Sequence, residues 1–214
     1  YAIDHCPRGL GDVYKRQHWC GPCMSSASPS LNNLKTSNPD DFTYVSFFQG
    51  SSTGWPDDAI GSSSSRRDHV MAASSGYPTF SFADEQTGSC YKVGAGGTNF
   101  YDSDYTSGGC MAPSSSDFSM ELSTSLNSAG DTVTTDLSIT YLGPLPSVSV
   151  YVYAAVTEHS GAENYDDGYK PHHVFRSWLL NTNNNGFEQV ILSPNNPYEL
   201  SWDESLSVVR AADG

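Results

Sequence analysis

Two cysteines, Cys20 and Cys23, are separated by two residues in the run Trp19-Cys20-Gly21-Pro22-Cys23. A pair at this spacing closes a small disulfide ring when the residues that follow are helical. Cys20 would then lie at the helix N-terminus, where unpaired N–H groups and the positive end of the helix dipole stabilise a thiolate. The spacing therefore predicts a redox-active dithiol, in which Cys20 attacks and Cys23 resolves the mixed disulfide.

Two other uses of this cysteine pair are a zinc site and a static structural disulfide. A structural zinc site needs a second ligand pair at short spacing, whereas Cys90 and Cys110 lie twenty residues apart. The motif therefore favours redox exchange over zinc, and it leaves the static disulfide as the remaining alternative.

The residues around the pair resemble those of the thioredoxin family, whose active site is Trp-Cys-Gly-Pro-Cys. A second shared mark is Gly76-Tyr77-Pro78-Thr79, which opens the apolar run 80–83. In that family the X-Pro bond at the start of such a strand is cis and faces the dithiol. The resemblance implies a groove for an extended segment of a protein substrate. Its lining residues would be Trp19, Gly21, Pro22, Tyr77 and Pro78.

Two elements must position the dithiol, a helix after it and a strand before it. The helical pattern runs from Cys20 to about Thr36, with Leu31 and Leu34 on one face. Pro29 marks a kink or break in this helix. It also departs from the family pattern, because thioredoxins usually carry a proline five residues after the second cysteine and Pro29 comes six residues after Cys23.

Residues 1–17, which precede the motif, have little of the apolar pattern that a buried strand needs. The segment from Cys6 to Gln17 resembles translated sequencing-adapter read-through, of the kind found at the ends of metagenomic reads. We therefore interpret residues 1–17 as a non-native leader that stands in place of the native first strand and any signal peptide. The alternative is a genuine terminus with a short strand over Val13 to Arg16.

The stretches after the motif alternate between strand and helix patterns. Aromatic and β-branched residues indicate strands, and a capping serine before an apolar stripe indicates a helix. The expected elements are a central strand (42–49), a polar loop (50–65), a helix (66–75) and a hairpin (78–83 with 90–93).

Cys90 and Cys110 bracket a loop rich in Gly, Ser and Tyr, which cannot build a core. We expect a disulfide between them, which would contribute about 3 kcal/mol of stability in the chain-entropy account. The chain has five cysteines, a number that suits an oxidising compartment but is odd. Cys6, in the leader, would be the extra one.

After a linker over 112–116, apolar and polar residues alternate with a period of two. Such alternation, with turn residues between the stretches, indicates antiparallel strands with one buried face. It predicts a β-sandwich of immunoglobulin type over 117–214. The strands expected there are 118–122, 133–141, 148–156, 173–180, 186–192 and 198–202.

This order of parts resembles a bacterial family of outer-membrane-associated proteins, in which a thioredoxin-like domain precedes an immunoglobulin-like sandwich. A local likeness is the strand 156–158, followed by a polar loop and the strand 173–176. We therefore expect an α/β thioredoxin-like domain over 18–111 and an all-β sandwich over 117–214. In that family the sandwich continues past the point where this chain stops.

The surface is expected to be acidic, since 24 Asp and Glu against 10 Lys and Arg give a formal net charge of −14. Such a charge repels phosphate backbones, and we expect no nucleic-acid partner. No apolar run approaches the ~20 residues of a membrane-spanning helix, so no transmembrane span is expected in this fragment. We also expect neither a metal site nor an organic cofactor.

The dithiol leads to the hypothesis of an extracytoplasmic thiol–disulfide oxidoreductase, which acts on protein thiols or disulfides with an unidentified redox partner. The resemblance and the cysteine usage place it in the periplasm, at the outer membrane surface or in the secreted fraction, in association with the cell envelope. The alternative is a non-enzymatic envelope or secreted binding protein on a thioredoxin scaffold, whose cysteines form a static bridge.

Overall fold

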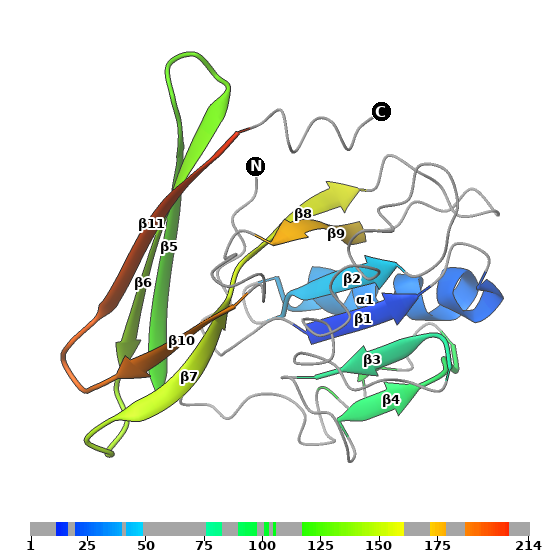
Figure 1. Cartoon of the computed structure of the whole chain (residues 1–214). Helices are drawn as coiled ribbons and strands as arrows, with labels where there is room; N and C mark the ends of the chain where they lie inside the picture. Colours follow the sequence, from blue (N-terminus) through cyan, green and yellow to red (C-terminus); the bar gives the residue numbers. More distant parts are fainter. Residues whose placement is uncertain are drawn as a thin grey trace.

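The described part of the chain consists mostly of β-strands, arranged in three sheets (Figure 1). This computed structural model describes residues 12–16, 20–39, 42–48, 76–82, 90–97, 101–102, 105, 117–160, 172–178 and 187–205. The elements are β1 (Asp12–Arg16), η1 (Cys23–Ala27), α1 (Ser28–Ser37), β2 (Tyr44–Phe48), β3 (Thr79–Ser81), β4 (Tyr91–Val93), β5 (Phe118–Leu126), β6 (Thr132–Tyr141), β7 (Val148–Tyr153), β8 (Ala155–Ser160), β9 (His172–Trp178), β10 (Phe187–Leu192) and β11 (Tyr198–Ser205).

The largest sheet has six strands, in the order β4-β3-β1-β2-β9-β8. β1 lies inside it, parallel to β2 and antiparallel to β3, and Lys15 is the partner of Thr79 at the start of β3. The β2 residues Tyr44 and Phe47 are both almost completely buried. Burial of this kind is typical of a strand inside a sheet that is covered on both faces.

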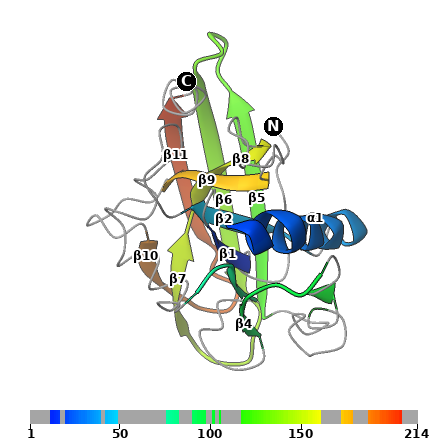
Figure 2. The ribbon, with the colours of Figure 1, turned by 90° about the vertical axis from the view of Figure 1, so that its right-hand side faces the viewer.

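One face of this sheet is covered by the helix that follows the cysteines (Figures 1 and 2). Ala27, Leu31 and Leu34 are spaced three and four residues apart, which puts them on the same side of the helix. They pack against aromatic side chains of the sheet and of the segment near residue 101, namely Phe42, Tyr44, Phe80, Phe82, Tyr101 and Tyr105. This aromatic core fixes the helix, and with it the cysteines, on the sheet.

The helical segment runs without a break from residue 21 to residue 37, but it contains the π-helical turn η1 ahead of Pro29. Pro29 has no N–H, and its ring would clash with the carbonyl four residues back in a regular α-helix. In η1 the Ser28 N–H instead donates to the carbonyl of Cys23, five residues back. This wider turn accommodates Pro29 within a continuous helix, so the irregularity predicted at this proline is a π-turn.

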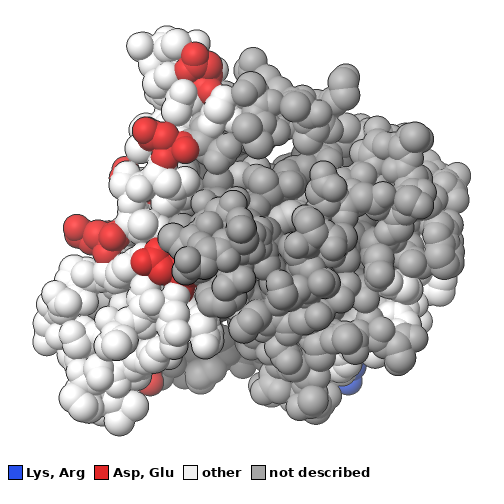
Figure 3. Space-filling model, in the orientation of Figure 1, with Lys and Arg blue, Asp and Glu red and all other residues white. Residues whose placement is uncertain are grey.

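Two smaller sheets, β11-β6-β5 and β10-β7, pack against each other through one apolar cluster. Leu137 and Ile139 of β6 are buried in this cluster. Asp136, which precedes Leu137 on the same strand, is exposed on the opposite face. The outer face of the three-stranded sheet is polar and acidic, and Glu121 and Glu199 flank β6 on it (Figure 3). The period-two pattern of the sequence therefore corresponds to one buried and one solvated face.

One extended stretch of chain belongs to two sheets. β7 continues through Ala154 into β8, so that residues 148–153 pair with β10 and residues 155–160 pair with β9. β9 also joins β2 in parallel, with Val174 opposite Ser46. Strands from the N-terminal and C-terminal halves of the sequence therefore share the six-stranded sheet.

The expected fold class, an α/β thioredoxin-like domain followed by an immunoglobulin-like sandwich, is wrong. The described chain is mostly strand, with one ten-residue α-helix among its described residues. β8 and β9, which we expected in the sandwich, lie in the six-stranded sheet instead. The physical reason is that alternation predicts which face of a strand is buried, but it does not identify the strand with which it pairs.

Most of the expected strands are present. The strand predicted over 42–49 is β2, and the hairpin predicted over 78–93 is the antiparallel pair β3 and β4. Residues 12–16, which we assigned to a leader, form β1, in agreement with the alternative of a short strand there. The helix expected over 66–75 and the linker over 112–116 lie outside the described residues.

Candidate functional site

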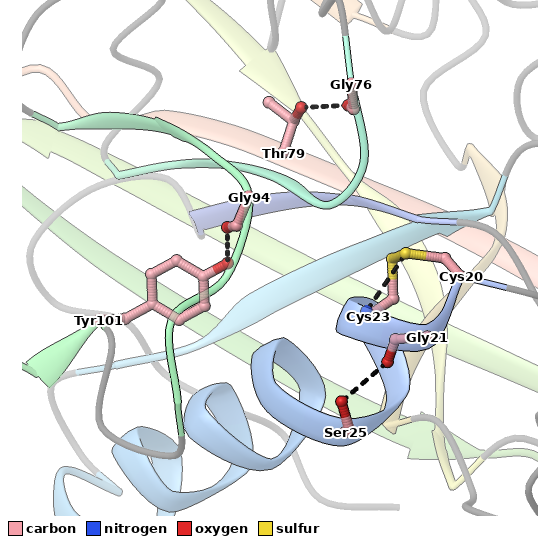
Figure 4. Close-up of a disulfide and its surroundings, with 8 residues drawn as sticks. All are labelled: Cys20, Gly21, Cys23, Ser25, Gly76, Thr79, Gly94 and Tyr101. Carbon is pink, nitrogen blue, oxygen red and sulfur yellow. Dashed lines mark hydrogen bonds between the residues drawn. A yellow bond between two sulfur atoms is a disulfide. The ribbon is translucent and has the colours of Figure 1, made fainter.

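The two cysteines form a disulfide at the start of the helix (Figure 4). Their Cα atoms are 5.2 Å apart, and the Cys20 carbonyl accepts a hydrogen bond from the Met24 N–H (3.1 Å). Cys20 therefore precedes the first helical turn, and Cys23 lies within it. This is the placement that the spacing of the pair predicts.

The backbone of the first turn also contacts the sulfur of Cys20. The Cys23 N–H donates a hydrogen bond to Cys20 Sγ over 3.2 Å. η1 has no acidic residue in its first turn, so no carboxylate there offsets the positive end of the helix dipole. A thiolate formed at Cys20 would be stabilised by the N–H group and by the dipole.

The two sulfur-bearing residues differ in their environment. Cys20 is 5 % exposed, whereas Cys23 is fully buried. Gly21 and Pro22, between them, are exposed. Of the two cysteines, Cys20 therefore keeps some exposed surface, and Cys23 keeps none.

Pro78 directly precedes β3, at the end of the six-stranded sheet from which the chain continues to the dithiol. β1 ends at Arg16, four residues before Cys20, and Thr79 at the start of β3 pairs with Lys15 near that end. The Tyr77–Pro78 peptide bond, immediately before Thr79, is cis. The Tyr77–Pro78 segment and the segment that leads to Cys20 therefore both lie near the C-terminal end of β1.

The segment around Pro78 is tied to the helix through residues that the sequence reasoning missed. The Gly94 N–H donates to the Pro78 carbonyl (2.7 Å), and the Tyr101 hydroxyl donates to the Gly94 carbonyl (3.3 Å; Figure 4). The Tyr101 N–H donates in turn to Ser30 Oγ on α1 (3.4 Å). Gly94, Tyr101 and Ser30 therefore connect the proline segment with the helix that carries the cysteines.

Gly94 occupies this position because of its backbone conformation. Its φ of +97° lies in the region that side-chain-bearing residues rarely adopt. A usable signal was the position of Gly94 directly after the predicted strand 90–93, where a chain reversal commonly requires glycine.

Thr79, at the start of β3, makes further hydrogen bonds next to Pro78. Its hydroxyl donates to the Gly76 carbonyl (2.8 Å), which closes the turn that contains Tyr77 and Pro78. Burial raises the pKa of Tyr91 on β4, and a hydrogen bond with Thr79 partly opposes that shift. Tyr91 therefore stays protonated at neutral pH and presents a hydroxyl rather than a charge beside the site.

Some of the predicted site residues lie outside the described part of the chain. These are Trp19 and Cys110. Cys90 is disulfide-bonded, and its pairing with Cys110 remains a prediction. Among the described residues, no group of three or more His, Cys, Asp or Glu side chains is arranged to hold a metal ion.

No protein-family model matches this chain, and neither a curated protein nor a solved structure matches it. Within the residues described, no helix combines the length and the apolar character needed to cross a membrane.

Proposed function

We propose that this chain is a thiol–disulfide oxidoreductase that acts on protein disulfides through Cys20 and Cys23. The observation that carries the proposal is the asymmetry of the pair. Cys20 is the more accessible residue and its Sγ accepts the Cys23 N–H, whereas Cys23 is buried directly behind it. A nucleophile that is held at a helix start, next to a shielded second thiol, is the arrangement that disulfide exchange requires.

In the reducing direction the chemistry proceeds in two exchanges. The Cys20 thiolate attacks one sulfur of the substrate disulfide, a mixed disulfide forms, and the other substrate sulfur leaves as a thiolate. The Cys23 thiolate then attacks Cys20 Sγ, which forms the Cys20–Cys23 bond and releases the second substrate thiolate. The substrate gains two electrons, the dithiol loses two, and an external dithiol reductant restores the starting state.

The proposed compartment is extracytoplasmic. The engagement of Cys90 in a disulfide in addition to the Cys20–Cys23 bond supports it, because structural disulfides persist in oxidising compartments and are rare in the cytosol. The scarcity of bases, 10 against 24 acids, favours substrates that are neutral or basic over acidic ones.

The test is reduction of insulin disulfides by dithiothreitol, with the protein in catalytic amount. We expect the wild type to accelerate insulin precipitation and Cys20→Ser to give only the rate of dithiothreitol alone. Thiolate absorbance of the reduced protein should show a Cys20 pKa well below the ~8.5 of a free thiol. Circular dichroism of Cys20→Ser verifies that the variant is folded.

The competing hypothesis is that the Cys20–Cys23 bond is a static structural disulfide, and one observation favours it. With 5 % of its surface exposed, Cys20 offers little area to an attacking sulfur. If the Cys20–Cys23 bond resists millimolar dithiothreitol in the native protein and insulin is not reduced, the pair is structural and the proposal of an oxidoreductase fails.

A further inference from the structure

Three histidine side chains lie close together in the β8–β9 hairpin, near the place where β9 pairs with β2. Glu158 pairs with Val174 and Ser160 with His172, so His159 on β8 lies opposite His173 on β9. The ring centroids of His159 and His173 are 5.3 Å apart, and those of His159 and His172 are 5.9 Å apart. All three imidazoles are therefore close to one another at this end of the hairpin.

The backbone of His173 explains why adjacent histidines contact the same ring. In a regular strand, neighbouring side chains point to opposite faces, which would separate the rings of His172 and His173. His173 instead has a φ of 52°, in the left-handed region where His is among the more frequent non-glycine residues. This irregularity brings both rings to His159.

His173 is also part of the contact with β2. It is only 6 % exposed, and its ring packs edge-on against Tyr44 with 4.7 Å between the centroids. His172 Nδ1 lies 3.1 Å from the His159 carbonyl oxygen, which requires Nδ1 to carry the proton. Further protonation of His172 would therefore occur at Nε2 and would turn the ring into a cation.

The connection between β9 and β2 is narrow. The paired residues are Ser46 and Val174, and the Ser46 hydroxyl donates to the His172 carbonyl over 2.9 Å. Beside this connection, Phe47 and Phe175 stack with their centroids 4.9 Å apart, and both are almost fully buried. The three histidines thus adjoin the short stretch that holds the hairpin on the sheet.

We propose that the His159, His172 and His173 cluster is an acid-sensitive latch, which releases the β8–β9 hairpin from β2 when its imidazoles are protonated. Histidine is the side chain whose charge ordinarily changes between pH 5 and pH 8. Among the described residues, the titratable rings in contact with His173 include Tyr44 from β2 and His159 from β8, and His172 is next to it on β9. Cations at these positions repel one another, and burial of a charged His173 carries a desolvation penalty.

The remainder of the molecule provides an internal reference. β5, β6, β7, β10 and β11 contain no histidine, so the two smaller sheets have no imidazole of their own that charges in this pH range. Release of the hairpin would expose backbone amides of β2 and β9, together with Phe47 and Phe175. It would leave the amides of β6 protected.

The test is amide hydrogen exchange read by mass spectrometry at pH 7.5 and pH 5.5, after correction for the intrinsic exchange rate. Peptides over 44–48 and 172–178 report the latch, and peptides over 132–141 report the sandwich. In the wild type we expect protection of the latch peptides to fall severalfold at pH 5.5, because the closed form disfavours charged imidazoles and the open form does not.

The matched variant is His173→Asn, because Asn tolerates the left-handed backbone but does not titrate. We expect its latch protection to be the same at both pH values. His159→Phe, which keeps a ring at position 159 without a charge, serves the same purpose if His173→Asn does not fold. Equal latch protection of the wild type at both pH values overturns the proposal. So does an equal acid-induced loss in the variants, or a simultaneous loss over 132–141.

Discussion

The backbone N–H of Cys23 donates a hydrogen bond to Sγ of Cys20, over 3.2 Å. In the proposed exchange, the residue that resolves the mixed disulfide would therefore also stabilise the sulfur that it attacks. Because Cys23 is buried and Cys20 is not completely so, the two sulfurs are chemically distinct before any substrate arrives.

This asymmetry predicts different behaviour of the two single-cysteine variants. Cys23→Ser should form a stable mixed disulfide with an aromatic disulfide reagent at Cys20, since no resolving thiol remains. Cys20→Ser should react roughly tenfold or more slowly, because its remaining thiol is buried. Intact-protein mass spectrometry over time gives both rates. Similar rates for the two variants would contradict the assignment of Cys20 as the nucleophile.

The hydrogen bonds of Gly94 predict a selective effect on activity. Gly94→Ala and Gly97→Ala both place a side chain at positive φ (+97° and +119°), which costs about 1–2 kcal/mol of stability in each case. Gly94, in addition, donates to the Pro78 carbonyl and accepts from Tyr101. We expect the two variants to lose similar stability in urea unfolding, and Gly94→Ala alone to slow insulin reduction. An equal loss of rate in both would show that the Gly94 contacts do not position the site.

The packing of the helix predicts a large stability effect at Leu31. Leu31 is fully buried in the aromatic core beneath the cysteines, whereas Leu145 is 54 % exposed. Leu31→Ala should lower the free energy of unfolding by about 3 kcal/mol, through lost burial and the cavity left behind. Leu145→Ala, the matched control, should change it by less than about 0.5 kcal/mol. Denaturant unfolding of both variants and of the wild type measures these differences, and similar losses of stability in the two variants would contradict the prediction.

Gly143 predicts a steric effect that depends on one neighbour. A Cβ at this position would overlap the ring and hydroxyl of Tyr141, which is 2 % exposed and whose hydroxyl oxygen accepts the Leu145 N–H (3.2 Å). Gly143→Ala should therefore cost about 1–3 kcal/mol, as overpacking does. In a Tyr141→Leu background the same substitution should cost clearly less. Thermal unfolding of the four proteins in this cycle measures the coupling, and additive effects would refute the steric explanation.

The β5–β6 turn predicts a measurable pKa change at Asp131. The Asn127 side-chain amide donates to the Asp131 carboxylate (2.7 Å), and this bond, followed by one from Thr132, holds the Asp131 pKa below its ordinary value of 3.8. Asn127→Ala should raise that pKa toward 3.8, and Thr132→Val should raise it less. Carboxyl chemical shifts across an acid titration report both values. A larger shift in Thr132→Val than in Asn127→Ala would reverse the order of causes.

The same interaction sets the direction of the pH dependence. Because the folded-state pKa of Asp131 lies below the unfolded value, the interaction stabilises the hairpin fully above the unfolded pKa. This contribution is lost as the pH falls through the folded-state pKa. Asn127→Ala should therefore reduce the acid sensitivity of the β5–β6 hairpin at pH values below about 4.

The sequence indicates strands well where one face is buried and the other is solvated. Leu137 and Ile139 of β6 alternate with polar residues, and the register follows from that alternation. β1 was predicted only as the alternative to a leader, because its sequence, Asp12 to Arg16, does not follow an apolar pattern. Its place inside the sheet comes from hydrogen bonds to β2 and β3, which propensity does not encode.

The candidate site could be predicted only in part, for a similar reason. Cys20, Cys23 and Pro78 belong to short motifs, and their types and spacing indicate their chemistry. Tyr101 and Ser30 are 71 residues apart in the chain and meet through one hydrogen bond. Contacts of that range depend on the tertiary fold, so no local pattern in the sequence indicates them.

The passage of residues 148–160 from one sheet into another has a consequence for any attempt to divide the molecule. A polypeptide that ends before residue 117 would lack β9, and β2 would become an open border of its sheet with unpaired N–H and carbonyl groups. Exposed edge strands of this kind can pair with strands of other copies of the chain. In the intact chain β9 pairs with β2, so the C-terminal half closes a sheet edge that the half with the cysteines would otherwise expose.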